Sequence, residues 1–119
     1  MTREDLDFEI RFFERLVNED SHFINALIPL AEIYTRKGLH EKAVALDLKI
    51  SKLRPEDEIA HYNLACSLAL MGRKVEALEA LERSIQLGYD DFDHMKRDPD
   101  LKSLNEDPRF RALMGQPPY

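Results

Sequence analysis

The residues that could support catalysis or metal binding are few and scattered in this sequence. The four histidines are His22, His40, His61 and His94. None belongs to an HExxH, HxH or His/Cys spacing that would bring two ligands to one metal ion. We therefore predict no metal site and no cofactor.

The one cysteine and the acidic runs show no reactive arrangement either. Cys66 is the only cysteine, which excludes an intrachain disulfide and a multi-cysteine metal site. A catalytic thiol needs a neighbouring base, and nothing beside Cys66 in the sequence supplies one. The acidic runs at 56–58 and 90–91 lie where helices are expected to start, and negative charge complements the helix dipole there. The sequence therefore predicts that the chain is not an enzyme.

The composition is that of a folded, acidic protein. Of its 119 residues, 44% are hydrophobic and 34% are charged, and 17 Lys and Arg against 23 Asp and Glu give a net charge of −6. Binding to nucleic acid or to an anionic membrane without specific contacts needs a basic surface, so we expect neither partner. No signal-peptide core and no run long enough to span a bilayer is present, which predicts a cytoplasmic location.

A repeat with an offset of 34 residues is the strongest pattern in the sequence. The recurring residues are small or apolar: Leu30-Ala31 with Leu64-Ala65, Gly38 with Gly72, Ala43 with Ala77, and Leu53 with Leu87. Apolar residues at i, i+3, i+4 and i+7 predict two helices per unit. The glycine between them supplies the left-handed conformation that ends the first helix. The repeat therefore predicts an all-α fold of antiparallel helical hairpins.

These residues resemble the tetratricopeptide repeat, whose pattern of a large residue, Leu-Gly/Ala, an aromatic residue, Gly and Ala maps onto both units. The matching residues are Leu27, Leu30-Ala31, Tyr34, Gly38, Ala43 and Pro55, and then His61, Leu64-Ala65, Leu68, Gly72, Ala77 and Leu81. The resemblance implies a right-handed stack of hairpins, with repeat 1 at 24–57 and repeat 2 at 58–91. Pro29 departs from the pattern, so we expect a kink or a late helix start there.

A capping helix is predicted at residues 4–20, before the repeats. Its apolar residues spread over roughly 200° of the helix surface, which is wider than one neighbouring helix covers. We expect it to cap the stack. The alternative is that Phe8 and Phe12 face another chain, as in a homodimer, because exposed apolar patches mark contact sites.

A truncated third unit and closing helices are predicted at 92–119. Asp98-Pro99 and Asp107-Pro108 each place an N-capping aspartate before a proline at the first helical position. This end resembles the closing segment that follows bacterial tetratricopeptide arrays. The resemblance covers nearly the entire chain, and we predict a single domain over 1–119.

The resemblance also implies a binding groove lined by the first helix of each unit. The residues facing it are Asn25, Ile28, Glu32 and Arg36, then Tyr62, Asn63, Cys66 and Leu70, and finally Lys96 and Arg97. Such a groove offers amides to a peptide backbone and an aromatic surface to an apolar side chain. The expected function is therefore a non-enzymatic adaptor that binds a peptide or helical segment of a partner protein.

Two alternatives to this function stay open. The C-terminal segment could fold back into the groove, which would leave a structural or self-assembling scaffold component. The chain could also be a regulatory subunit of an enzyme. A clamp for a C-terminal carboxylate, known in one subfamily, is a weaker match, because only Asn63 and Arg97 occupy its positions.

Overall fold

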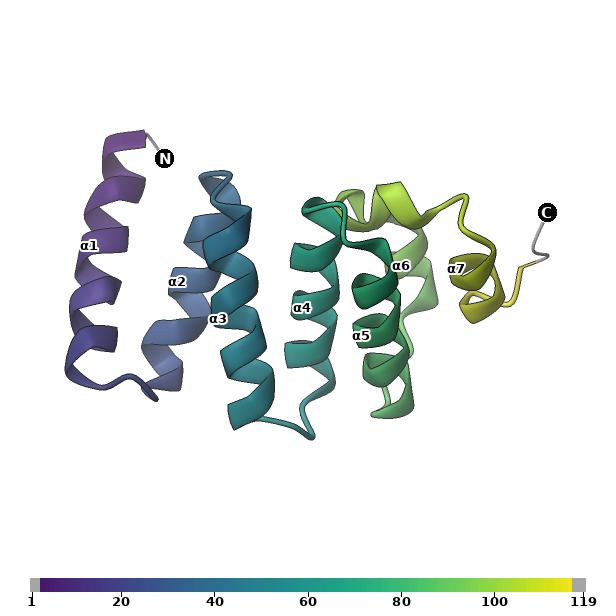
Figure 1. The fold of residues 1–119 in the computed structure, drawn as a ribbon, viewed down its shortest axis with the longest axis horizontal. Helices are drawn as coiled ribbons and strands as arrows, with labels where there is room; N and C mark the ends of the chain where they lie inside the picture. Colours follow the sequence, from purple (N-terminus) through teal and green to yellow (C-terminus); the bar gives the residue numbers. More distant parts are fainter. Residues whose placement is uncertain (1–2, 117–119) are drawn as a thin grey trace. The chain divides into compact units, whose positions relative to one another are not determined.

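The computed structural model describes residues 3–116, and helices follow one another along this part of the chain (Figure 1). The order is α1 (Arg3–Glu19), α2 (Ile24–Arg36), α3 (His40–Leu53), α4 (Glu58–Leu70), α5 (Lys74–Gln86), α6 (Phe92–Arg97), the 3-10 helix η1 (Pro99–Leu104) and α7 (Pro108–Leu113). No strand occurs within 3–116. The all-α prediction is confirmed, and the order of the helices is that of a helical repeat.

The chain divides into two compact units, one ending at Arg54 and the other beginning at Pro55. In unit 1, α2 packs against both α1 and α3. In unit 2, α4 packs against α5 and η1, while α6 lies against η1 and α7 against α5. The single domain over 1–119 stays a prediction, and its ends at 1–2 and 117–119 lie outside the described residues.

Both hairpins turn at a glycine, as the repeat predicts. Gly38 follows α2 with a φ of 80°, and Gly72 follows α4 with a φ of 77°. A side chain would crowd the backbone in this left-handed region, so glycine suits both positions. After α2, the amide of Gly38 donates to the carbonyl oxygen of Thr35 at 3.0 Å. The next amide, of Leu39, donates to Tyr34 at 2.8 Å, so the last carbonyls of the helix are satisfied.

Helix α2 runs through Pro29 and does not start late. It begins at Ile24, so the late start expected at the proline is wrong, and the kink, the other expectation, stays a prediction. Pro29 removes one backbone hydrogen bond near the first turns of the helix. Ala26 and Leu27, which precede it, are fully buried. The packing of this turn outweighs the lost hydrogen bond, and the helix therefore extends ahead of the proline.

The Asp-Pro pairs begin the last two helices of unit 2, as predicted. The Asp98 carboxylate accepts a hydrogen bond from the amide of Asp100 at 2.9 Å. Asp107 accepts one from the amide of Arg109 at 2.8 Å. A proline occupies the first helical position after each aspartate. The first pair opens the 3-10 helix η1 and the second opens α7, so this short duplication produces two helices of different type.

Two contacts fix α1 on α2 in unit 1, beside a shared apolar core. The core includes Ile10 of α1 and Leu30 of α2. The hydroxyl of Tyr34 donates to the carboxylate of Glu14 at 2.6 Å. An ion pair joins Lys37, just after α2, to Asp7 of α1. These contacts orient α1, and so they also decide which of its side chains point away from the core.

Candidate functional site

The four predicted groove residues of unit 1 lie along one exposed side of α2. They are spaced three or four positions apart: Asn25, Ile28, Glu32 and Arg36. The side chains of Ile28 and Glu32 are exposed to solvent. Residues at this spacing fall on the same face of a helix. The structure therefore brings these four side chains together as one surface, which we call the α2 stripe. Ile28 is its apolar member, with 45% of its surface exposed.

A groove of about 370 Å³ lies between α1 and α2 at the edge of this stripe. Its lining is an apolar floor with a polar rim, formed by Phe8, Glu9, Phe12 and Phe13 of α1 and by Pro29, Glu32, Ile33 and Arg36 of α2. Glu32 and Arg36 belong to both the groove and the stripe. Open apolar depressions with a few polar groups are the usual form of a binding site for side chains of a partner.

Two phenylalanines of α1 stand exposed at this groove. Phe8 has 65% and Phe12 has 49% of its surface accessible to solvent. The Phe12 ring rests edge-on against Phe13, with ring centres 5.1 Å apart and planes at 76°. Covering one phenylalanine side chain contributes about 1.5–3 kcal/mol to an association. These rings are therefore the largest source of binding energy that unit 1 offers at its surface.

The rim of the groove carries an exposed ion pair. The Arg36 guanidinium lies 2.5 Å from the Glu32 carboxylate, one helical turn away. A solvent-exposed pair of this kind contributes only about 0.3–0.5 kcal/mol to stability. Both side chains can therefore exchange this contact for one with a partner at little cost. The groove can thus hold apolar side chains and supply hydrogen bonds at its rim.

In unit 2 the corresponding side of α4 is covered by the C-terminal segment. Tyr62, which stands 34 positions after Ile28, has only 5% of its surface exposed. Its ring stacks on that of Tyr89, with centres 4.4 Å apart and planes within 2°. Its hydroxyl donates to the Asp98 carboxylate at 2.5 Å. Tyr62 thus faces the segment that leads into η1 and not an open groove.

Cys66 is buried at the same place. Its thiol donates to Asp98 across 3.8 Å. Burial, and secondarily the charge of Asp98, raises the pKa of the Cys66 thiol far above its usual range. A thiol that stays protonated is a poor nucleophile. Burial also raises the pKa of Tyr62, and the hydrogen bond to Asp98 adds to the effect.

Three groups here are close enough to share a metal ion. Ligand atoms of Cys66, Asp98 and Asp100 all lie within 4.8 Å of one another. Asp98, however, already accepts hydrogen bonds from the Tyr62 hydroxyl and the Cys66 thiol. The arrangement therefore acts as a polar junction between α4 and η1, held together by hydrogen bonds to one carboxylate.

The other predicted residues of unit 2 differ in exposure. Asn63, Lys96 and Arg97 lie nearer the solvent than Tyr62 and Cys66, and Leu70 is half-buried. The Arg97 guanidinium donates to the carbonyl oxygen of Asp93 at 3.2 Å. A role for these residues in partner binding stays a prediction. Tyr62 and Cys66 could take part only if the segment around η1 moved away from α4.

The groove contains residues that the sequence did not single out as a site. Phe13, Pro29 and Ile33 line it together with Glu9. The apolar residues of the first helix spread over a wide arc, which indicates such a surface. On this basis the sequence predicts that Phe8 and Phe12 could face another chain. Which side chains of α2 lie beside them depends on how the two helices pack, and the repeat does not specify that contact.

Comparisons with known proteins identify a family and a relative. Residues 10–107 match the bacterial transcriptional activator domain. The chain is 33% identical over 86 residues to a chloroplastic protein of Arabidopsis thaliana, and the match covers 70% of this chain and 26% of that protein. The chain therefore spans about a quarter of the length of this relative. Among the described residues, no helix is long and apolar enough to cross a membrane.

Proposed function

The chain belongs to the bacterial transcriptional activator domain family, and from this premise we propose that it is a non-enzymatic module that binds a segment of a partner protein. The observation that carries the proposal is the open side of unit 1. There the α2 stripe lies next to an apolar groove with exposed aromatic rings. We propose further that the hairpins are tetratricopeptide-type repeats, because the glycines that end α2 and α4 recur 34 residues apart in the same conformation.

The partner segment would bind through one apolar anchor and a few hydrogen bonds. An apolar side chain would enter the groove beside Ile28, while Glu32 and Arg36 would bond to polar groups of the segment. The amide of Asn25 would bond to its backbone, as in other modes of segment recognition. The net charge of −6 favours the approach of a basic or neutral segment over an acidic one.

The family name points to the regulation of transcription. In that setting, we propose that this chain contacts a protein and leaves contacts with DNA to other parts of the assembly. Its acidic balance supports this assignment, because affinity for DNA arises largely from basic side chains on phosphates. The proposal is compatible with a cytoplasmic location and with a role as the regulatory subunit of an enzyme.

A second candidate function is a scaffold component whose groove is closed by its own C-terminal segment. The burial of Tyr62 beneath the segment around η1 favours this alternative for unit 2. The α2 stripe of unit 1 stays open, so the two candidates differ in whether this stripe binds a partner segment. A substitution on the stripe can therefore distinguish them.

The test uses Ile28→Glu, with Val75→Glu as its matched control. Both residues are exposed β-branched side chains on helices, Ile28 at 45% and Val75 at 64%, so neither change disturbs a core. A partner is first captured from the native source and identified by mass spectrometry, and its affinity is then measured by calorimetry. We expect Ile28→Glu to weaken binding at least tenfold, about 1.4 kcal/mol, and Val75→Glu to leave it unchanged. Equal affinities for both variants would refute the proposal.

A further inference from the structure

A mixed group of metal-binding side chains lies inside unit 2, between α4 and the start of η1. Cys66 of α4 offers a sulfur atom, and Asp98 and Asp100 offer carboxylate oxygens. These ligand atoms all lie within 4.8 Å of one another. The imidazole Nε2 of His94, on α6, lies 3.3 Å from the Asp98 carboxylate. Sulfur, oxygen and nitrogen donors from three segments of the chain therefore meet at one place.

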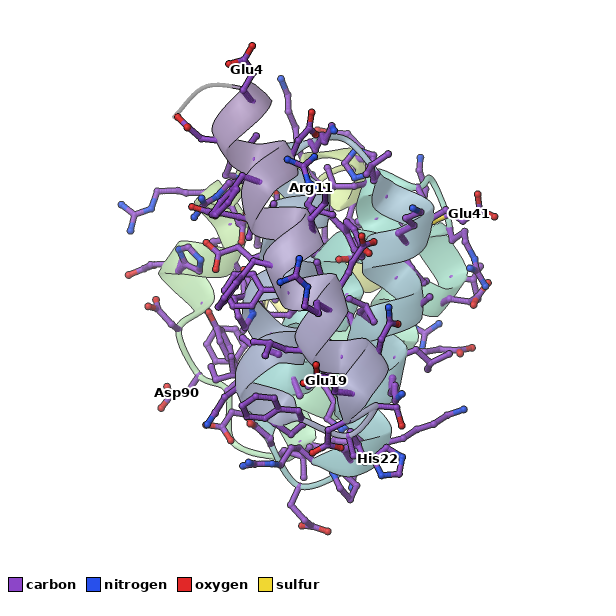
Figure 2. The ribbon with its side chains drawn as sticks, turned by 90° about the vertical axis from the view of Figure 1, so that its left-hand side faces the viewer. Glu4, Arg11, Glu19, His22, Glu41 and Asp90 are labelled. Carbon is purple, nitrogen blue, oxygen red and sulfur yellow. The ribbon has the colours of Figure 1, made fainter. Side chains whose placement is uncertain are left out.

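The central donors of this group are withdrawn from solvent. Cys66 has 7% of its surface exposed, and the side chain of Asp98 has 10%. Asp90, in the loop before α6, is exposed, and Figure 2 shows its carboxylate pointing away from the ribbon. An exposed carboxylate keeps its hydration, whereas a buried one must be compensated by hydrogen bonds or by a cation. Asp98 therefore differs from an ordinary surface acid.

The charges in this group favour the binding of a cation. Two carboxylates close to a buried thiol repel each other, and burial leaves this repulsion poorly screened. Asp98 forms an ion pair with His94, but that ring is cationic only when it is protonated. The guanidinium of Arg97, on the same helix as His94, donates to the backbone carbonyl oxygen of Asp93 at 3.2 Å. A divalent cation among the donors would relieve the repulsion directly.

We propose that unit 2 binds one Zn²⁺ ion through four side chains. They are Cys66, Asp98, Asp100 and His94. Zinc takes thiolate, imidazole and carboxylate ligands in tetrahedral geometry, which holds a sulfur and an oxygen ligand about 3.5 Å apart. The Cys66 Sγ atom lies 3.8 Å from a carboxylate oxygen of Asp98, so small side-chain movements bring the ligands into place. Mg²⁺ and Ca²⁺ fit less well, because they prefer oxygen ligands alone.

Binding would exchange a proton for the metal ion. Burial raises the pKa of the Cys66 thiol, so the thiol is protonated in the metal-free chain. On binding, this proton leaves to the solvent and the thiolate forms the Zn–S bond, while His94 coordinates as a neutral imidazole. The hydroxyl of Tyr62 donates to Asp98 at 2.5 Å and would hold that carboxylate in position as a ligand.

This proposal departs from the sequence-based expectation of no metal site. Cys66 and Asp98 are 32 positions apart, and the packing of η1 against α4 is what brings them together. No short sequence motif contains the four ligands. The inference is also independent of the proposed partner binding, because that proposal uses the α2 stripe of unit 1.

The test adds Co²⁺, a spectroscopic substitute for Zn²⁺, to the full chain after treatment with a chelator. We expect a thiolate-to-cobalt charge-transfer band in the near ultraviolet and the visible bands of a four-coordinate ion. Zn²⁺ should abolish both, and Mg²⁺ should change neither. Cys66 is the only cysteine, so the charge-transfer band reports on this thiol in the wild type itself.

Variants then identify the remaining ligands, with Zn²⁺ affinity measured by calorimetry and folding checked by circular dichroism. Asp100→Asn and His94→Gln should each weaken binding at least about tenfold, because each removes a ligand. Tyr62→Phe should weaken it by about tenfold through the loss of the hydrogen bond to Asp98. Asp90→Asn removes the same charge from an exposed position and is the matched control, which should bind like the wild type.

Three results would overturn the proposal. The first is a wild type without a charge-transfer band at millimolar Co²⁺. The second is Zn²⁺ binding that Asp90→Asn weakens as much as Asp100→Asn does, which would mean an adventitious ion only. The third is an unchanged affinity of His94→Gln, which would exclude the four-ligand arrangement.

Discussion

Asp98 is the residue that links most of the polar contacts in unit 2. One of its carboxylate oxygens accepts from Tyr62 at 2.5 Å and lies 3.3 Å from the imidazole of His94. The other accepts from the amide of Asp100 and so caps η1. A charged acceptor of this kind strengthens each hydrogen bond that it receives. The aspartate therefore both starts a helix and holds that helix against α4.

The buried thiol beside Asp98 gives a pH prediction. The raised pKa of Cys66 keeps the thiol protonated in the folded chain, whereas in the unfolded chain it ionises near its ordinary pKa of 9.0. At pH 8 we expect alkylation of the native chain by iodoacetamide to be at least about 100-fold slower than in urea, because the reactive species is the thiolate. Cys66 is the only cysteine, so the modification measured by mass spectrometry has one site.

The raised pKa of Cys66 also sets the direction in which the free energy of unfolding changes with pH. Below about pH 8 both states hold the proton, and the stabilisation of the folded state is complete. As the pH rises above about 9, only the unfolded state loses the proton, so the free energy of unfolding falls. Cys66→Ala should show a smaller fall between about pH 8 and 10 than the wild type. Rapid native alkylation at pH 8 would contradict the buried, protonated thiol.

At the scale of the element, the helix ends of each hairpin are fixed by local chemistry. After α4, the amide of Gly72 donates to Ala69 and that of Arg73 donates to Leu68, both at 3.0 Å. The same two bonds close α2 at Gly38, so the two units share one type of turn. A Cβ at Gly72 would meet nothing within 4 Å, so space is not what requires the glycine. The positive φ is the requirement.

Substitution of Gly72 should therefore act through the backbone alone. We expect Gly72→Ala to lower the free energy of unfolding by about 1–2 kcal/mol, the usual cost of a side chain in the left-handed region. Gly72→Asn should lower it less, because asparagine tolerates this conformation better. Urea denaturation followed by circular dichroism measures both. Equal stability of the alanine variant and the wild type would mean that the turn adopts another conformation.

At the scale of the whole molecule, the net charge bears more on the proposed class of partner than any single residue does. The chain carries −6 at neutral pH, and its family is named for transcriptional activation. A protein that binds DNA without specific contacts needs a cluster of cations that displaces counterions from the phosphates. The acidic balance of this chain works against such a cluster and favours a protein partner.

DNA binding by the isolated chain is therefore expected to be absent at physiological salt. Fluorescence anisotropy with a labelled random duplex should give no binding up to about 100 µM chain in about 150 mM salt, since non-specific DNA binders show dissociation constants of about 1–100 µM there. A basic DNA-binding protein serves as the positive control. A micromolar Kd that weakens steeply with added salt would show that a local basic surface overcomes the net charge.

The helices and their ends were determined by the sequence, because they depend on interactions over a few residues. The i, i+3, i+4 pattern, the glycines at 38 and 72, and the aspartates before Pro99 and Pro108 act within single turns, and each appears in the structure as predicted. Pro29 shows the limit of such rules. Its local preference for a helix start is overcome by the packing of the residues before it.

Whether each predicted binding face is open or covered was decided only by the tertiary structure. Ile28 and Tyr62 occupy equivalent positions 34 residues apart, yet Ile28 is 45% exposed and Tyr62 is 5% exposed. A repeat assigns both to the same side of a helix, but it does not say whether another segment covers that side. In unit 2 the loop between α5 and α6 supplies the stacked ring of Tyr89, and the residue before η1 supplies the carboxylate of Asp98, and these contacts bury the face. Burial depends on contacts between residues far apart in the chain, and the local periodicity of the sequence carries no information about them.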